Sequence, residues 1–182
     1  MPSLQDDSLI APREGAPALG TVVADKYELQ SILGVGGMGV VYGATHLQLG
    51  QSVAIKVLIA DELQRKEALT RFLREARAAA ALQSDHVVRI FDVGTLPDGV
   101  PYMVMERLRG KDLGAVLAQR GALAWGEAAE YIAQACHALG LAHLAGIIHR
   151  DLKPSNLFLS RRSDGSPLVK VLDFGISKTL GS

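Results

Sequence analysis

Four side chains whose chemistry suits phosphoryl transfer lie close together near the end of the sequence. Asp151 can take a proton from a hydroxyl, and Lys153 offers positive charge to a phosphate. Asn156 and Asp173 carry oxygen atoms of the kind that magnesium prefers when it also binds the phosphates of a nucleotide. Pro154 blocks a regular helix before Asn156, so a tight loop is expected there. The segment therefore predicts phosphoryl transfer assisted by magnesium.

The elements that must position these residues divide into a strand-rich first half and a helical second half. In the first half one helix is expected over 67–82, and strands are indicated over 27–33, 40–45, 52–58, 87–93 and 101–106. In the second half we expect helices over 112–120 and 125–145, and a hairpin of 157–159 with 169–172. A mostly β part followed by a mostly α part predicts an α+β fold of two lobes with a cleft between them.

The N-terminal residues differ in composition from the rest of the chain. Residues 1–26 are rich in Pro, Ala, Gly and Ser and have no hydrophobic periodicity, which is typical of a flexible tail. Order is expected to begin near Tyr27, and the change from strands to helices falls near Arg107. We therefore expect three parts: a tail over 1–26, a strand-rich lobe over 27–107 and a helical lobe over 108–182.

A glycine-rich turn is expected over 34–39, between the first two strands. Glycines let backbone N–H groups come close to an anion, because no Cβ intervenes. A dinucleotide-binding fold would continue such a turn as a helix, whereas residues 40–45 continue it as a strand. The turn alone leaves two interpretations open, a phosphate-binding loop and an ordinary glycine-rich turn.

The strand over 52–58 carries a lysine next to a small residue. Side chains alternate along a strand, so Ala54 and Lys56 share one face. Gly39 and Val41 share a face of the neighbouring strand in the same way. A small residue beside an ammonium group suits a flat adenine base next to phosphates. The alternative is a lysine that faces solvent on an edge strand.

Glu75 lies close to the apolar stripe of the helix expected over 67–82. An unpaired carboxylate is costly to bury, so this position needs a partner, and Lys56 is a candidate. The alternative is a surface pair with Arg71, four residues earlier on the same helix.

The composition of the 182-residue chain allows a packed core, with 48% hydrophobic and 21% charged residues. Lys plus Arg equals Asp plus Glu, at 19 each, so the charge does not favour nucleic acid as a partner. The single cysteine, Cys136, cannot form an internal disulfide and is expected to be a small buried residue. No apolar run approaches the ~20 residues of a membrane span, and the N-terminus has no apolar signal core. We expect a cytoplasmic protein, with nothing implied about a membrane anchor after residue 182.

Three motifs in this order resemble the signature of eukaryotic-type protein kinases: VAIK at 53–56, HRDLKPSN at 149–156 and DFG at 173–175. The segment 33–41 is similar to the glycine loop of these kinases. Lys153, two residues after Asp151, resembles the serine/threonine-specific branch. The similarity runs from about residue 27 to residue 178 and is typical of the bacterial Hanks-type serine/threonine kinases. It implies the two-lobed protein-kinase fold, here with an incomplete second lobe.

The resemblance implies transfer of the γ-phosphoryl group of ATP to a protein Ser or Thr hydroxyl, with Mg²⁺ as metal ion. Asp151 would orient and deprotonate the hydroxyl, and Lys153 would neutralise the phosphoryl group. Asn156 and Asp173 would hold the magnesium. The residues implied in ATP binding lie on the glycine loop, the adjoining strands, the helix and the chain after the last strand: Leu33, Gly34, Val35, Gly36, Gly37, Met38, Gly39, Val41, Ala54, Lys56, Glu75, Glu106 and Leu108.

A complete kinase domain continues well past the DFG motif, whereas this sequence ends at Ser182. We expect a fragment of a longer protein, the alternative being a short gene product, and little kinase activity from these residues alone. The helix over 125–145 is then expected to expose apolar surface on one side. A second function stays open: a nucleotide-binding pseudokinase that serves as an interaction module. The intact catalytic and metal-binding residues argue against it for the parent protein, whereas the missing lower lobe would argue for it if Ser182 were the true end.

Overall fold

The computed structural model describes residues 15–36, 39–59, 69–70, 72–73, 76–77 and 80–173. The chain forms two compact units. Unit 1 comprises Met1–Phe72 and Ile90–Arg107, and unit 2 comprises Leu73–Arg89 and Leu108–Ser182. The strand-rich lobe expected over 27–107 differs from unit 1, because residues 73–89 belong to unit 2.

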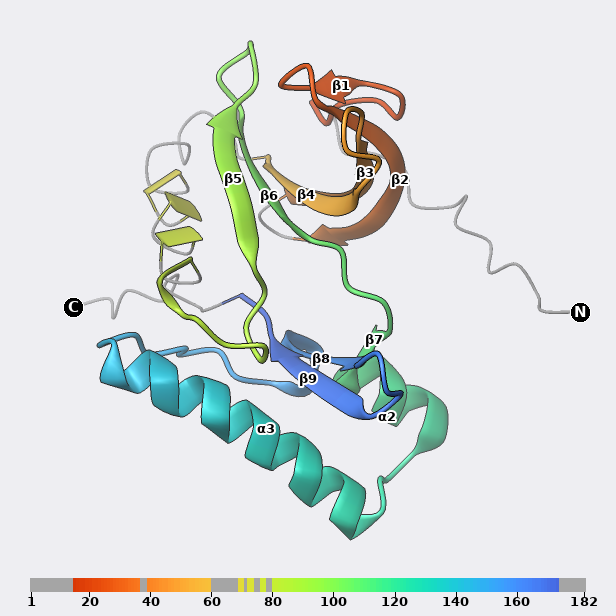
Figure 1. Cartoon of the computed structure of the whole chain (residues 1–182), viewed down its shortest axis with the longest axis vertical. Helices are drawn as coiled ribbons and strands as arrows, with labels where there is room; N and C mark the ends of the chain where they lie inside the picture. The colour runs from red at the N-terminus through yellow and green to blue at the C-terminus, as the bar shows by residue number, and fades with distance from the viewer. Residues whose placement is uncertain are drawn as a thin grey trace, which may run out of the picture. The chain divides into compact units, whose positions relative to one another are not determined.

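A six-stranded antiparallel sheet forms unit 1 (Figure 1). In spatial order its strands are β1 (Val22–Val23), β2 (Tyr27–Gly36), β3 (Gly39–His46), β4 (Ser52–Leu58), β6 (Pro101–Glu106) and β5 (Ile90–Thr95). Every second residue of the central strands faces the hydrophobic core, namely Val40, Tyr42 and Ala44 of β3 and Val53, Ile55 and Val57 of β4. Burying each of the larger of these side chains contributes roughly 1.5–3 kcal/mol, which is why the alternating segments form strands.

Most of the expected elements of unit 1 lie where the sequence indicates, and β5 is the exception. A strand was expected over 87–93, but β5 begins at Ile90. Val87 forms an isolated parallel bridge with Val171 of unit 2 instead. Of the described residues in the helix expected over 67–82, residues 69–70, 72–73, 76–77 and 80–81 are helical, and Leu82 lies beyond the end of the helix.

The flexible tail expected over 1–26 is wrong for the part that the structure describes. β1 pairs with β2, and Val23 is 1% exposed within the core of the sheet. The Tyr42 hydroxyl, which lies on the core face of β3, donates a hydrogen bond of 2.8 Å to the carbonyl oxygen of Pro17. Only one residue of a two-residue strand is buried, so the segment has no periodicity that composition and pattern could reveal.

Unit 2 combines a three-stranded antiparallel sheet with helices (Figure 1). The strands lie in the order β7 (Lys111–Asp112), β8 (Leu157–Arg161) and β9 (Pro167–Val171). The helices are α2 (Leu113–Arg120), α3 (Trp125–Leu144) and the short 3₁₀ helix η2 (Pro154–Asn156). The Asp112 side chain accepts a hydrogen bond from Ala115 N at 2.9 Å and so caps the start of α2.

Helix α3 packs on β9 through a stripe of small and aromatic residues: Tyr131, Ala135, Ala138 and Ala142. Its other side exposes Trp125, Ile132 and Leu144, which confirms that this helix presents apolar surface. Among the described residues, no helix is both long and apolar enough to cross a membrane.

Cys136 is exposed, so its expected burial is wrong. It follows Ala135, which is buried, and one residue along a helix turns the side chain by about 100° from its neighbour. The alanine-rich composition of α3 hid this, because alanine occurs on both faces of the helix.

Two neighbouring valines of β1 test whether residues before Tyr27 belong to the folded sheet. Val23→Ala should lower the free energy of unfolding of unit 1 by about 2 kcal/mol, since two buried methyl groups are lost. Val22→Ala, at a position 43% exposed, should change it by less than about 0.5 kcal/mol. Urea unfolding of both variants measures the difference. Equal effects of the two substitutions would contradict the burial of β1.

Candidate active site

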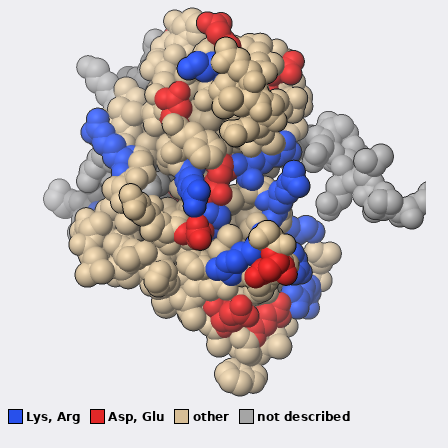
Figure 2. All heavy atoms as spheres, viewed as in Figure 1, with Lys and Arg blue, Asp and Glu red and all other residues tan. Residues whose placement is uncertain are grey.

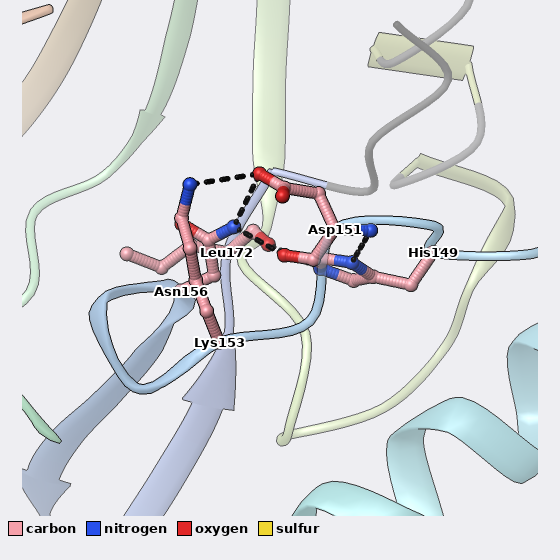
Figure 3. Close-up of polar contacts among 5 residues, drawn as sticks. All are labelled: His149, Asp151, Lys153, Asn156 and Leu172. Atoms are coloured by element: carbon pink, nitrogen blue, oxygen red, sulfur yellow. Dashed lines mark hydrogen bonds and ion pairs between the residues drawn. The ribbon is translucent and has the colours of Figure 1, made fainter. Parts of the chain in front are cut away.

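The segment His149–Asn156, called the catalytic loop below, brings the side chains of Lys153 and Asn156 to Asp151 (Figure 3). Lys153 Nζ lies 2.9 Å from Asp151 Oδ2 and forms an ion pair with it. Asn156 Nδ2 donates to the backbone oxygen of Asp151 at 2.8 Å and contacts its Oδ2 at 3.4 Å. The Asp151 and Lys153 side chains are 37% and 52% exposed, so solvent can reach them. The structure therefore brings these three predicted residues together.

Backbone geometry around η2 produces this convergence. Pro154 occupies the first turn of η2, where its missing N–H costs nothing, and Asn156 N donates to Lys153 O at 2.9 Å. This tight turn carries Asn156 back toward Asp151. Arg150, which precedes Asp151, has a φ of 60° and so adopts a left-handed conformation.

Buried His149 joins the loop to the end of β9. It is 3% exposed, and its Nε2 donates to the carbonyl oxygen of Leu172 at 2.8 Å. Asp151 N donates to its Nδ1 at 3.4 Å, which fits the tautomer that carries its proton on Nε2. Leu172 N in turn donates to Asn156 O at 2.9 Å. Leu172 precedes Asp173, so these bonds place Asp173 beside the loop. A backbone carbonyl has no signature in a sequence, and Leu172 was not predicted.

In unit 1 the sheet brings three predicted residues to one face. Val41 pairs with Lys56 across β3 and β4, and Gly43 pairs with Ala54. All four lie opposite to the face whose side chains form the core. The predicted sharing of a face is thus confirmed, and Lys56 is on a central strand with neighbours on both sides, not on an edge. This excludes the alternative of an edge-strand lysine.

The glycine turn lies between β2 and β3, with Gly36 paired to Gly39. Among the described residues, a Cβ added at Gly34 or Gly36 would meet nothing within 4 Å, so packing against this part of the chain does not require glycine at either position. Gly39 differs, because its φ is 149° and a Cβ there would collide with the carbonyl oxygen of Val57. Packing therefore explains Gly39 but not the other two.

A sequence profile described as protein kinase domain matches residues 27–182. The chain belongs to the protein kinase family. Its two units, a curled antiparallel sheet and an incomplete helical part, agree with the expected kinase fold.

Several bacterial kinases are similar to this kinase chain. It is 44% identical over 162 residues to serine/threonine-protein kinase Pkn1 of Myxococcus xanthus, which covers 89% of this chain and 23% of that protein. It is 43% identical over 161 residues to serine/threonine-protein kinase PknB of Mycobacterium tuberculosis, covering 87% of this chain and 25% of PknB. The crystal structure of the PknI kinase domain of Mycobacterium tuberculosis matches with a TM-score of 0.72 and 32% identity, over 90% of this chain and 64% of that domain. The chain thus spans about a quarter of the length of the curated relatives that it matches.

The residues expected to hold magnesium fit a hard cation. The amide nitrogen of Asn156 is turned toward Asp151, so its amide oxygen points the other way. Asp173 is exposed and has a φ of 43°, a conformation that asparagine and aspartate tolerate better than most residues. An amide oxygen and a carboxylate are a suitable set for magnesium, which commonly takes one or two carboxylates together with substrate phosphates.

The kinase residues divide between the two units. Unit 1 holds the sheet residues and Glu106, the last residue of β6, whereas unit 2 holds Leu108, the catalytic loop and Asp173. Leu33 and Val35 flank Gly34 on β2 and are both partly exposed, at 42% and 38%. Three predicted positions lie outside the described residues: Gly37, Met38 and Glu75.

Alanine substitutions in the gene product that contains this chain can distinguish Gly36, which packing does not explain, from Gly39, which packing does explain. Gly36→Ala should leave the free energy of unfolding within about 0.5 kcal/mol, because the added Cβ meets no atom of the described residues within 4 Å. It should raise KM for ATP about fivefold, the equivalent of one backbone hydrogen bond of about 1 kcal/mol.

Gly39→Ala is the matched control. It should lower stability by about 1–3 kcal/mol, because of its positive φ and the collision with β4. Thermal unfolding and ATP titration of both variants give the two readouts. A Gly36→Ala protein with lower stability and unchanged KM would support the interpretation of residues 34–39 as an ordinary glycine-rich turn.

Proposed function

We propose that the protein containing this chain is a serine/threonine protein kinase. It transfers the γ-phosphoryl group of ATP to Ser or Thr hydroxyls of protein substrates, with Mg²⁺ as the metal ion. Membership of the protein kinase family supports the reaction class, and the names of the similar relatives support the hydroxyl specificity. The observation that carries the proposal is the convergence of Lys153 and Asn156 on Asp151.

Asp151 has the surroundings of a base for a hydroxyl group. Its Oδ2 accepts from Lys153 and Asn156, and these contacts orient the carboxylate that would take the proton of a substrate hydroxyl. Lys153 Nζ, 2.9 Å from that carboxylate, would neutralise a phosphoryl group that moves toward a hydroxyl bound at Asp151. Catalysis would rest on position and charge, without a covalent intermediate on the protein.

Asn156 and Asp173 would hold the magnesium ion. When bound, the ion neutralises charge on the phosphates of ATP and orients them for transfer. On the sheet, Lys56 would bind the α- and β-phosphates, and Gly34 and Gly36 would let backbone N–H groups approach them.

The remaining proposed contacts concern the adenine base. Leu33, Val35, Val41 and Ala54 would enclose it, and backbone groups at Glu106 and Leu108 would bind its edge. Glu75 would pair with Lys56, as in the family.

The surface charge is compatible with a protein substrate, and the use of ATP supports a cytoplasmic location. On the face shown in Figure 2, acidic and basic side chains lie among one another, and the net charge is zero. This arrangement gives no electrostatic support for nucleic acid as a substrate. The use of ATP supports placing this kinase domain in the cytoplasm.

Two substitutions test the proposed reaction in the gene product that contains this chain. Asp151→Asn should lower kcat on the order of 10²–10⁴-fold, because the base is lost while the shape of the side chain is kept. Lys56→Met should also lower kcat/KM for ATP strongly, since a phosphate contact is removed from the sheet. The measurement is transfer of labelled γ-phosphate to a library of peptides that carry Ser, Thr or Tyr.

The control is Lys111→Met on β7, an exposed lysine outside the site, which should leave the rate unchanged. Unchanged phosphate transfer by both Asp151→Asn and Lys56→Met would reject the proposed kinase activity. A wild-type protein that binds ATP and transfers nothing would support the pseudokinase. Labelling of Tyr peptides alone would reject the serine/threonine specificity.

A further inference from the structure

The segment Ser84–Val88 lies against β9 on the side away from β8. Val171 N donates to His86 O at 2.8 Å, and Val87 forms a parallel bridge with Val171. β9 is an edge strand of its sheet, so its outer N–H and C=O groups need partners from elsewhere. The Ser84–Val88 segment supplies them where β9 ends, two residues before Asp173.

Side chains bind further backbone groups on the outer edge of β9. Val169 N donates to Gln134 Oε1 of α3 at 2.8 Å, and Val169 O accepts from His86 Nδ1 at 2.8 Å. The His86 ring also meets the ring of His137 on α3, with centroids 5.8 Å apart. Backbone groups along the outer edge of β9 are thus bonded up to Val171, and beyond it Leu172 is held by the catalytic loop.

Lys170 is the unexpected member of β9. It is 5% exposed, between Val169 and Val171, which are 0% and 1% exposed. Its Nζ donates to the backbone oxygen of Val87, itself a buried residue, at 3.3 Å. The bond ties β9 to the Ser84–Val88 segment through a group that water barely reaches, where hydrogen bonds are electrostatically stronger.

A lysine buried at this position stabilises the fold less than an apolar side chain of similar length would. Taking an amino group out of water is costly even when it is hydrogen-bonded, and an apolar side chain of similar length would fill the space at less cost. The hydrogen bond from Lys170 to Val87 O instead fixes the position of β9 along the Ser84–Val88 segment. Such precision matters near a magnesium ligand, since magnesium demands near-ideal octahedral geometry.

We propose that Lys170 and His86 are positioning residues for Asp173. Their bonds to Val87 O and Val169 O lock β9 to the Ser84–Val88 segment, and the locked strand presents the Asp173 carboxylate to magnesium. This inference deepens the proposed function and rests on it, because it assigns to Asp173 the metal-binding role given above.

Lys170→Met is the first test, made in the gene product that contains this chain. It keeps the length of the side chain and removes the amino group. Binding of Mn²⁺ in the presence of ADP, followed by the loss of the free-Mn²⁺ paramagnetic resonance signal, should weaken by roughly 3- to 30-fold, the usual range for coupling through a packed network. The thermal midpoint should stay within about 8 °C of wild type, because the loss of a hydrogen bond of about 1 kcal/mol is partly offset by the apolar side chain. Lys111→Met, on β7 of the same sheet but exposed, should change neither quantity.

His86 allows a test by rescue. His86→Phe keeps a ring at the contact with His137 but loses the donor to Val169 O, so it should weaken Mn²⁺–ADP binding to a similar extent. His86→Asn places an amide N–H close to the position of Nδ1 and should restore binding to within about twofold of wild type. Hydrogen–deuterium exchange at Val171, whose N–H donates to His86 O, should rise in His86→Phe and Lys170→Met and return in His86→Asn.

The outcomes separate the two proposals. A wild-type protein that binds no Mn²⁺–ADP rejects the proposed function and this inference with it. Normal binding by wild type, and unchanged binding and exchange in Lys170→Met and His86→Phe, rejects the positioning role alone. Weaker binding in both variants that His86→Asn fails to rescue rejects His86 Nδ1 as the group responsible. Weaker binding explained by a lower thermal midpoint assigns a merely structural role and also rejects it.

Discussion

The main-chain groups of Leu172 carry the bonds on which the site of unit 2 depends. Its N–H donates to Asn156 O, and its carbonyl accepts from the Nε2 of buried His149. Both bonds join residues that are far apart in the sequence. His149 is almost inaccessible to water, so its bond to Leu172 O competes little with solvent. The catalytic loop and the end of β9 are therefore one piece, and Asp151 and Asp173 are placed by the same pair of bonds.

A different constraint organises unit 1. The antiparallel register sets Val41 opposite Lys56, and the alternation of side chains keeps both off the face that forms the core. Gly39 makes this register possible, because any side chain there would collide with Val57 of the adjoining strand. Three of the residues assigned to ATP, Val41, Ala54 and Lys56, thus lie on β3 and β4, whose register is unbroken and whose backbone is held by burial of the opposite face.

Structural features were predicted correctly from the sequence where they depend on neighbouring residues and were missed where they depend on distant ones. Strands β3, β4 and β6 lie within a residue of their expected bounds, because their alternation is a local consequence of burying one face. The exposure of Cys136 and the order of residues 15–26 were missed, since α3 has alanine on both faces and β1 buries a single side chain. The late start of β5 was missed because Val87, although β-branched like its neighbours, pairs with Val171, a residue distant in sequence.

The sequence by itself determined the family of this chain and the chemical types of its catalytic residues, because a proton acceptor, a cation and hard oxygen ligands at fixed spacing around Pro154 are written in the order of residues. Only the tertiary structure decided that Asp151 is held by both Lys153 and Asn156, and that residues 73–89 fold with the catalytic unit. The physical reason is that the catalytic loop and residues 84–88 are joined to β9 through backbone groups of Leu172, Val87, Val169 and Asp151. Every residue carries such groups, so no residue type marks the ones that will be paired.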